Sequence, residues 1–280
     1  MPLFSVIIPT YNHCDTILWA IKSVQEQTLQ DFEIIVVGDG VPDRTRDIMM
    51  DFCKKDKRIV FRDNPKGESK GEVHRHQAIL AAKGKYIAYI ADDDLWYKTH
   101  LEILEKGLTD NDFCNTLHSC VYPNGTLKIF AGDIGQQYCR NILSRLKFNF
   151  FGPTCVGHRR VSYQRLASGW SPAPTGEWTD LHMWRKWIAD EKVRFCTLPI
   201  LTTIHLDSPG REEMTIAERA AESEAWLEKI RDPYAFAAIE LNAFRQQTLA
   251  LGGFQFMAHH YKHEFDKLQQ AQRLSMKKRR

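Results

Sequence analysis

The chain has no long hydrophobic run. None of its apolar stretches approaches the roughly 18 residues that a membrane-spanning helix needs. The opening residues Pro2-Leu3-Phe4 carry neither a basic start nor a secretory cleavage site. The seven cysteines are widely spread and form no C-x-x-C pair, a usage that suits a reducing compartment. These absences predict a protein without a membrane span that is made and kept in the cytoplasm.

A strong excess of charge of one sign is also missing. The formal net charge is only +3 over 280 residues, which is too small to predict a nucleic-acid partner. Positive charge gathers at the C-terminus, from Lys277 to Arg280. This tail is either simply solvated or makes a peripheral contact with the anionic inner face of a membrane. Such a contact would be weak, because four charges without an apolar anchor hold a membrane poorly.

Short apolar runs alternate with helical patterns up to about residue 110, an order that predicts an α/β fold with a parallel sheet. Beyond this point the pattern loosens into mixed strands and short helices, and from residue 213 it is almost wholly helical. We expect strands at residues 4–8, 32–37, 58–62 and 86–90, and helices at residues 15–26, 43–54, 70–82 and 97–107.

Three consecutive carboxylates, Asp92, Asp93 and Asp94, directly follow the apolar run at residues 86–91. That run is typical of a buried strand, so the acids are expected at its carboxyl end, where open α/β sheets bind ligands. Hard divalent cations take carboxylate and phosphate oxygens, and crowded acids repel one another unless a cation intervenes. A helix N-cap is the alternative interpretation. It would explain one acid and not three.

Three sequence motifs occur in the order and with the spacing that a known family shows. They read FSVIIPTYN at residues 4–12, DFEIIVVGDG at residues 31–40 and GKYIAYIADDDLW at residues 84–96. Together they resemble the family 2 inverting glycosyltransferases of GT-A fold, over roughly the first 110 residues. The resemblance implies a Rossmann-like, mostly parallel sheet flanked by helices. Residues 1–110 would bind a nucleotide sugar, residues 111–210 would bind the acceptor, and residues 211–280 would form a helical extension.

The resemblance also implies roles for the residues of the donor half. Pro9 and Tyr11 would line the nucleotide pocket, where the Tyr11 ring can stack on the base. Asp39 matches an acid that contacts the base, although Gly38 and Val41 depart from the family pattern. Arg75 lies near the position of a basic residue close to the diphosphate.

In the third motif, Asp92 would face the ribose or phosphates and Asp93 would bind Mn²⁺ or Mg²⁺ directly. Many relatives have an acid at the position of Ala91. Because this acid is absent here, Asp93 and Asp94 would have to coordinate the metal.

An inverting transfer needs one general base to take the proton of the acceptor hydroxyl. Residues 177–185, EWTDLHMWR, resemble the family's base region. Asp180 is the matching acid and Glu177 is the second candidate. The alternative role for both acids is helix N-terminal charge or capping. His205 and Arg211 flank a Ser208-Pro209-Gly210 loop that could close over the diphosphate, although a structural role for His205 is the simpler interpretation.

The expected function is metal-dependent inverting transfer of a single sugar from a nucleoside diphosphate sugar, with uridine as the first candidate base. The acceptor would be a hydroxyl of a glycan or glycolipid, in polysaccharide or glycolipid synthesis. Processive relatives carry a Q-x-x-R-W signature, and the sequence MWRKW at residues 183–187 lacks its Gln. The rival hypotheses are a sugar-1-phosphate nucleotidyltransferase and a non-catalytic nucleotide-sugar-binding scaffold.

The C-terminal helical region suggests an interface and, more weakly, a metal site. Tyr234, Leu241 and Phe244 belong to an apolar series at helical spacing, which predicts packing on the catalytic domain or in a homo-oligomer. His259 and His263 are four residues apart and His260 lies between them. We interpret these histidines as a solvated helix face, because no acid or cysteine constellation supports a metal there.

Overall fold

The structure is a computed structural model that describes the backbone of residues 1–277 and the side chains of residues 1–253, 255 and 262. It divides into two compact units, Met1–Phe236 and Ala237–Arg280. The proposed histidine face at residues 259–263 and the basic tail fall where side chains are not described. No helix of the described part of the chain is long and apolar enough to cross a membrane.

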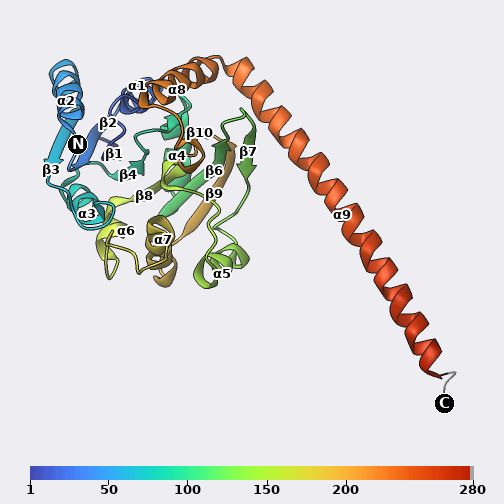
Figure 1. Cartoon of the computed structure of the whole chain (residues 1–280). Helices are drawn as coiled ribbons and strands as arrows, with labels where there is room; N and C mark the ends of the chain where they lie inside the picture. Colours follow the sequence, from blue (N-terminus) through green and yellow to red (C-terminus); the bar gives the residue numbers. More distant parts are fainter. Residues whose placement is uncertain (278–280) are drawn as a thin grey trace. The chain divides into compact units, whose positions relative to one another are not determined.

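The first unit is built on a mixed sheet with the strand order β3-β2-β1-β4-β8-β6-β7 (Figure 1). Strands β3, β2, β1 and β4 are parallel to one another, whereas β8 runs antiparallel to both β4 and β6. A parallel β9 also pairs with β6. The strand bounds are β1 Phe4–Thr10, β2 Phe32–Asp39, β3 Ile59–Asn64, β4 Tyr86–Tyr89, β6 Phe113–Val121, β7 Leu127–Phe130, β8 Val156–Arg159 and β9 Phe195–Leu201.

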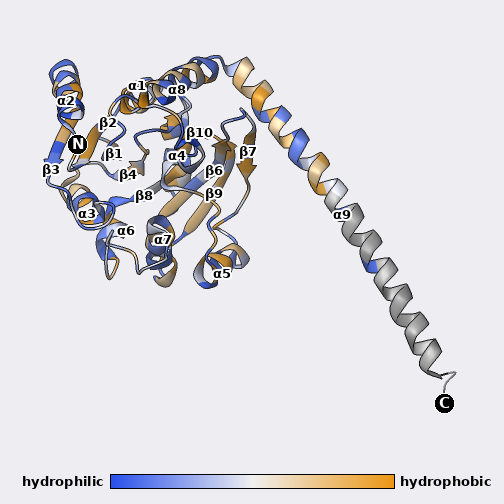
Figure 2. Cartoon of the chain, in the orientation of Figure 1, coloured by the Kyte–Doolittle hydropathy of each residue, from blue (hydrophilic) through white to orange (hydrophobic). Residues whose placement is uncertain are grey.

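Helices cover both faces of the sheet, as a parallel sheet with crossover connections requires. Figure 2 shows that the helices around the sheet carry both hydrophilic and hydrophobic residues. The sequence therefore predicts the α/β class, the four N-terminal strands and the helices between them correctly. The helix bounds in the first unit are α1 Ile17–Gln25, α2 Asp43–Lys55, α3 Glu72–Ala81, α4 His100–Leu108, α5 Gln137–Arg145, α6 Arg160–Arg165, α7 Thr179–Ala189 and α8 Ile216–Arg231.

Alternating side chains of the central strands feed two separate cores. Ile7 and Ile87 belong to one core, with the tryptophans of α7, whereas Val6 and Ile8 belong to the other, with apolar residues of α1 and α4. The period of two follows from the pleat of a strand. Each fully buried Ile or Val contributes about 1.5–3 kcal/mol. Packing on both faces thus holds the sheet in place, and with it the edge where the parallel strands end.

That edge gathers the polar ends of the parallel strands. The register pairs Thr10 at the end of β1 with Gly38 of β2, and β4 is followed directly by the acids of residues 92–94. A small antiparallel pair, β5 Leu95–Trp96 with β10 Thr203–Ile204, then brings residues 203–205 beside these acids. The prediction that the acids of residues 92–94 lie at the carboxyl end of a buried strand is confirmed.

Residues 211–236 belong to the first compact unit, where α8 packs on α1 and beside β5. Helix α9 extends over Pro233–Lys277, so its first turn lies in the first unit and the remainder forms the second. Tyr234, Leu241 and Phe244 are 85%, 49% and 36% exposed. A homo-oligomer through this helix stays a prediction.

Candidate active site

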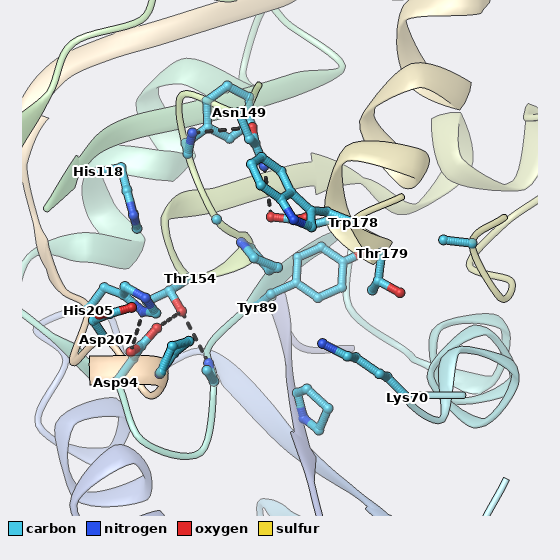
Figure 3. Close-up of a pocket in the computed structure, with 18 of the residues that line it drawn as sticks. Lys70, Tyr89, Asp94, His118, Asn149, Thr154, Trp178, Thr179, His205 and Asp207 are labelled. Carbon is cyan, nitrogen blue, oxygen red and sulfur yellow. Dashed lines mark hydrogen bonds and ion pairs between the residues drawn. The ribbon is translucent and has the colours of Figure 1, made fainter. Parts of the chain in front are cut away.

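A cavity of about 1020 Å³ opens at the carboxyl ends of the strands. Figure 3 shows that its labelled residues come from both halves of the first unit, with Asp94 and His205 toward one end and Asn149 and Trp178 toward the other. The structure therefore brings much of the predicted donor side and the predicted base side into one cavity. The predicted site residues that line it are Pro9, Arg75, Asp92, Asp94, Glu177 and Asp180.

The remaining predicted residues, Tyr11, Asp39 and Asp93, do not line this cavity. Asp39 is buried, accepts hydrogen bonds from Lys66 Nζ at 2.7 Å and the Gly67 amide at 2.6 Å, and lies under Gly71. Gly71 has a φ of +67°, and an added Cβ would lie 2.8 Å from Asp39 Cγ, so glycine is required there. The half-exposed ring of Tyr11 lies 5.3 Å from the same Lys66 Nζ. Tyr11, Asp39 and Lys66 thus form a single cluster.

The acids of residues 92–94 are buried, and each has polar or charged partners. His13 Nδ1 lies 3.0 Å from Asp92 Oδ1 and 3.8 Å from Asp93 Oδ2. Asp93 Oδ2 also accepts hydrogen bonds from Arg219 at 2.8 Å and from Ser208. Burial and the neighbouring acids raise the pKa of Asp93 to about 6, despite these donors. The surroundings of Asp93 therefore favour additional positive charge.

Asp94 is held by a different set of groups. Its Oδ1 lies 2.8 Å from His205 Nδ1 and accepts a hydrogen bond from the Leu206 amide at 3.2 Å, while Oδ2 accepts one from Thr154. Burial alone would raise the pKa of Asp94, but His205 and these donors lower it. Burial opposes protonation of His205, yet Asp94 raises the pKa of the imidazole to about 9. Asp94 and His205 therefore form an ion pair that orients the ring.

At the other end of the cavity, Asp180 sits in the first turn of α7. Its Oδ2 accepts a hydrogen bond of 2.7 Å from Asn149 Nδ2, and its Oδ1 accepts one of 2.8 Å from the Leu181 amide. Burial raises the pKa of this carboxyl above its ordinary value. Glu177 differs because its Oε1 forms an ion pair of 2.5 Å with Arg185. Of these two acids, Asp180 is thus the one that forms no ion pair within the described residues.

Arg75 is buried in the cavity wall, where its guanidinium lies 4.3 Å from the centre of the Trp170 ring. Its Nε has no hydrogen-bond partner within the described residues. Burial lowers the pKa of the group, but an arginine stays charged. A buried cation with an unused donor, facing a cavity, suits an anionic ligand.

Among the side chains that the structure describes, two groups have the donor atoms and the spacing for a metal ion. They are His13 with Asp92 and Asp93, and Cys120 with His205 and Asp207; within each group the donor atoms lie within 4.8 Å of one another. The first group fits a divalent cation of the Mn²⁺ type, since it offers two carboxylates and one imidazole. It also contains Asp93, whose pKa is raised by burial and by the neighbouring acids.

The sequence analysis missed several residues that meet the acids. His13 directly follows the first motif, so its place after β1 offered a signal. Arg219 offered none, because it lies 126 positions from Asp93 on a helix that the sequence analysis assigned to a separate extension. Ser208 and His205 were seen only as parts of a loop that could close.

The family model described as Glycosyl transferase family 2 matches residues 5–166. A segment of 109 residues is 43% identical to an uncharacterized glycosyltransferase of Rickettsia conorii, covering 39% of this chain and 18% of that protein. Another comparison gives 39% identity over 102 residues to UDP-Glc:alpha-D-GlcNAc-diphosphoundecaprenol beta-1,3-glucosyltransferase WfaP of Escherichia coli, covering 36% of this chain and 39% of that protein. The chain thus spans less than half the length of either relative.

Solved structures show the same fold at low sequence identity. S. aureus TarS 1-349 in complex with UDP-GlcNAc aligns with a TM-score of 0.54 and 19% identity, over 73% of this chain and 58% of that one. The mannosyltransferase PcManGT of Pyrobaculum calidifontis, in complex with GDP-Man and Mn²⁺, aligns with a TM-score of 0.54 and 21% identity, over 87% and 69%. Since the family match also covers more than half of the 280 residues, this chain belongs to glycosyl transferase family 2 and has the GT-A fold.

Proposed function

We propose that this chain transfers one sugar, with inversion, from a uridine diphosphate sugar to a hydroxyl of a glycan or glycolipid, in polysaccharide or glycolipid synthesis. The observation that carries the proposal is the cavity itself, which is lined by Asp92, Asp94 and His205 and also by Asp180. Figure 3 shows Asp94 and His205 toward one end and Asn149, which donates a hydrogen bond to Asp180, toward the other. A departing diphosphate and an attacking hydroxyl need these two kinds of group on opposite sides of one sugar.

The Tyr11, Asp39 and Lys66 cluster is the proposed base-binding part of the donor site. A uracil ring can stack on the exposed face of Tyr11, and a carboxylate such as Asp39 can accept the hydrogen bond of its N3–H. Arg75 is proposed to bind the diphosphate through its unused Nε donor. The TarS structure is a complex with UDP-GlcNAc and WfaP is named for UDP-Glc, which supports uridine over other bases. The PcManGT complex with GDP-Man makes guanosine the second candidate.

Asp93 is proposed to hold the divalent cation, together with His13 and Asp92. When bound, Mn²⁺ or Mg²⁺ would offset the charge of the diphosphate as a Lewis acid. Asp94, also expected as a ligand, has both oxygens engaged by His205, Leu206 and Thr154. Its proposed part is therefore to hold the His205 ring in place. The presence of an imidazole in the group favours Mn²⁺ over Mg²⁺.

Asp180 is proposed as the general base. As the acceptor oxygen forms its bond to the anomeric carbon, the bond from that carbon to the diphosphate breaks and the electron pair leaves with the diphosphate. The proton of the acceptor hydroxyl passes to Asp180. Burial raises the pKa of this carboxyl, which strengthens it as a base.

Calorimetric titration of UDP into the full chain, with and without Mn²⁺, tests the donor site. We expect binding that Mn²⁺ strengthens at least tenfold in the wild type, and a loss of this gain in Asp93→Ala. Asp51→Ala is the matched control, because Asp51 is an exposed acid paired only with Lys55 on α2. Equal binding with and without metal would overturn the metal proposal. Binding of GDP in place of UDP would overturn the choice of uridine.

A further inference from the structure

A patch of large apolar side chains is exposed beside the cavity on the acceptor side. Tyr138, Leu146, Phe148 and Trp178 are 73%, 55%, 43% and 47% exposed. Leu146 and Phe148 lie in the loop that follows α5, and Trp178 directly precedes α7. Single exposed apolar residues are common, but several on two elements that pack together, as α5 and α7 do, mark an interaction site. We name these four residues the acceptor-side patch.

Basic side chains accompany the patch, and the one acid that adjoins it in the sequence, Glu177, is paired with Arg185. No Asp or Glu occurs from Ile134 to Gly176, a stretch that contains six arginines and lysines. Arg145 and Lys147 alternate with Leu146 and Phe148 and are exposed. Lys147 Nζ lies 5.5 Å from the centre of the Trp178 ring, which connects the loop to the start of α7. Apolar and basic groups that alternate in this way match the chemistry of an anionic membrane surface.

The same loop reaches the proposed base. Asn149 follows Phe148 and donates its hydrogen bond to Asp180. Arg185 of α7 holds the loop in place. Its guanidinium donates hydrogen bonds to the carbonyls of Leu143 and Leu146 and forms an ion pair with Glu177. Trp178 belongs both to the patch and to the wall of the cavity. A surface that holds the patch would therefore lie next to the acceptor end of the cavity.

We propose that the acceptor-side patch docks this enzyme on an anionic lipid bilayer. The apolar side chains would enter the interface while Arg145 and Lys147 meet the lipid phosphates. The link to the reaction rests on the proposed function: an acceptor anchored in that bilayer by a lipid would present its hydroxyl to Asp180 without leaving the membrane. The docking itself involves neither the donor nor the metal.

Co-sedimentation of the full chain with vesicles tests the proposal, without nucleotide or metal present. One vesicle type contains phosphatidylglycerol and phosphatidylethanolamine, and the other contains only phosphatidylcholine. We expect the wild type to sediment with the anionic vesicles and not with the neutral ones. The double variant Leu146→Ser with Phe148→Ser should bind about tenfold more weakly, because two apolar side chains no longer enter the interface. Lys147→Glu should weaken binding to anionic vesicles similarly.

The matched controls carry the same changes on α2, β3 and the turn between them. Met50→Ser with Val60→Ser alters two side chains that are 51% and 45% exposed, and Lys57→Glu reverses an exposed charge. Both controls should sediment like the wild type, and equal melting temperatures would show that all variants are folded. A variant with Lys277, Lys278, Arg279 and Arg280 replaced by Ala separates the patch from the basic tail.

Three results would overturn the proposal. The wild type could fail to sediment with vesicles of either composition, which would leave a protein partner as the occupant of the patch. The patch variants could sediment as well as the wild type. The tail variant alone could abolish binding, which would assign the attachment to the C-terminus. None of these readings depends on the donor titration, so a failure of docking and a failure of the proposed function are distinguishable.

Discussion

Asp180 and Glu177 are three residues apart, yet their surroundings give them different chemistry. Asp180 is held by two neutral donors, Asn149 and the Leu181 amide, which fix its orientation without supplying a full charge. Glu177 is neutralised by Arg185, whose other nitrogens brace the loop after α5. A base must accept a proton in the transition state, and an ion pair with arginine opposes that. These contacts therefore favour Asp180 as the base, whereas Glu177 holds Arg185 against the loop after α5.

Replacing Asp180 by Asn should abolish transfer while leaving donor binding intact. The amide keeps the size of the carboxyl and an oxygen for the Asn149 hydrogen bond, but it cannot take a proton. We expect kcat to fall by about 10²–10⁴-fold, and the dissociation constant of UDP to change less than twofold. Glu177→Gln is the matched comparison and should lose far less activity. Near-normal turnover by Asp180→Asn, measured alongside donor titration, would assign the base elsewhere.

The acids of the site were accessible from the sequence, but their partners were not. Asp92, Asp93 and Asp94 follow a strand in a recognisable motif, so local pattern placed them at the sheet edge. His205, Ser208 and Arg219 reach them from more than 100 positions away. Such contacts depend on how β10, the following loop and α8 close over the edge, and no local periodicity encodes that closure. The ion pairs are therefore a product of the tertiary fold.

At the scale of elements, α8 acts as part of the site rather than as an appendage. Thr215 caps its N-terminus in a capping box with Glu218, and Arg211, which is 1% exposed, ties the helix back to the core through Glu222. The next residue after Glu218 is Arg219, so the cap fixes the turn that delivers the guanidinium to Asp93. Helix α8 thereby supplies a permanent positive charge at the acid proposed to bind metal.

Arg219→Gln should therefore destabilise the metal-free protein and increase its response to Mn²⁺. Removing one partner of a buried ion pair costs about 3–5 kcal/mol, because the other charge stays buried. A bound cation would restore part of this loss, so Mn²⁺ should raise the melting temperature of the variant more than that of the wild type.

Arg231→Gln on the same helix is the matched control for Arg219→Gln. Arg231 pairs with Glu26 and Glu228 at the surface, where ion pairs contribute about 0–1 kcal/mol. It should melt close to the wild type with or without metal. An equal response to Mn²⁺ in Arg219→Gln and wild type would mean that the guanidinium and the cation do not share Asp93.

At the scale of the whole molecule, the first unit buries neutral histidines in its core. His100 is fully buried between Trp96, whose ring centroid is 4.4 Å away, and Thr202, whose Oγ1 lies 2.7 Å from its Nδ1. Burial lowers the pKa of His100 and of His158 to about 3. His100 lies at the start of α4 and His158 on β8, and no motif in the sequence predicted that either is buried. Their burial has a consequence for the stability of the entire unit.

Acid should destabilise the protein well above the pH at which ordinary carboxylates are protonated. An unfolded histidine has a pKa near 6.5, so below that value the unfolded chain binds more protons than the folded one. The stability held by neutral His100 is thus complete above about pH 6.5 and decreases toward pH 3, by about 1.4 kcal/mol per pH unit. His100→Phe should flatten the fall in unfolding free energy between pH 6.5 and 5 by this amount. Denaturant titrations at several pH values measure the slope.

Thr202→Val is the control for this pH dependence, because it removes the hydrogen bond to His100 and leaves the imidazole buried. Its slope should match that of the wild type, even if its stability is lower at every pH. Groups with raised pKa values, such as His205 and Asp93, titrate alike in all three proteins, so they cancel when slopes are compared. If His100→Phe kept the full wild-type slope, the imidazole of His100 would have to be accessible to protons in the folded state, and the tight packing around Trp96 would have to open in acid.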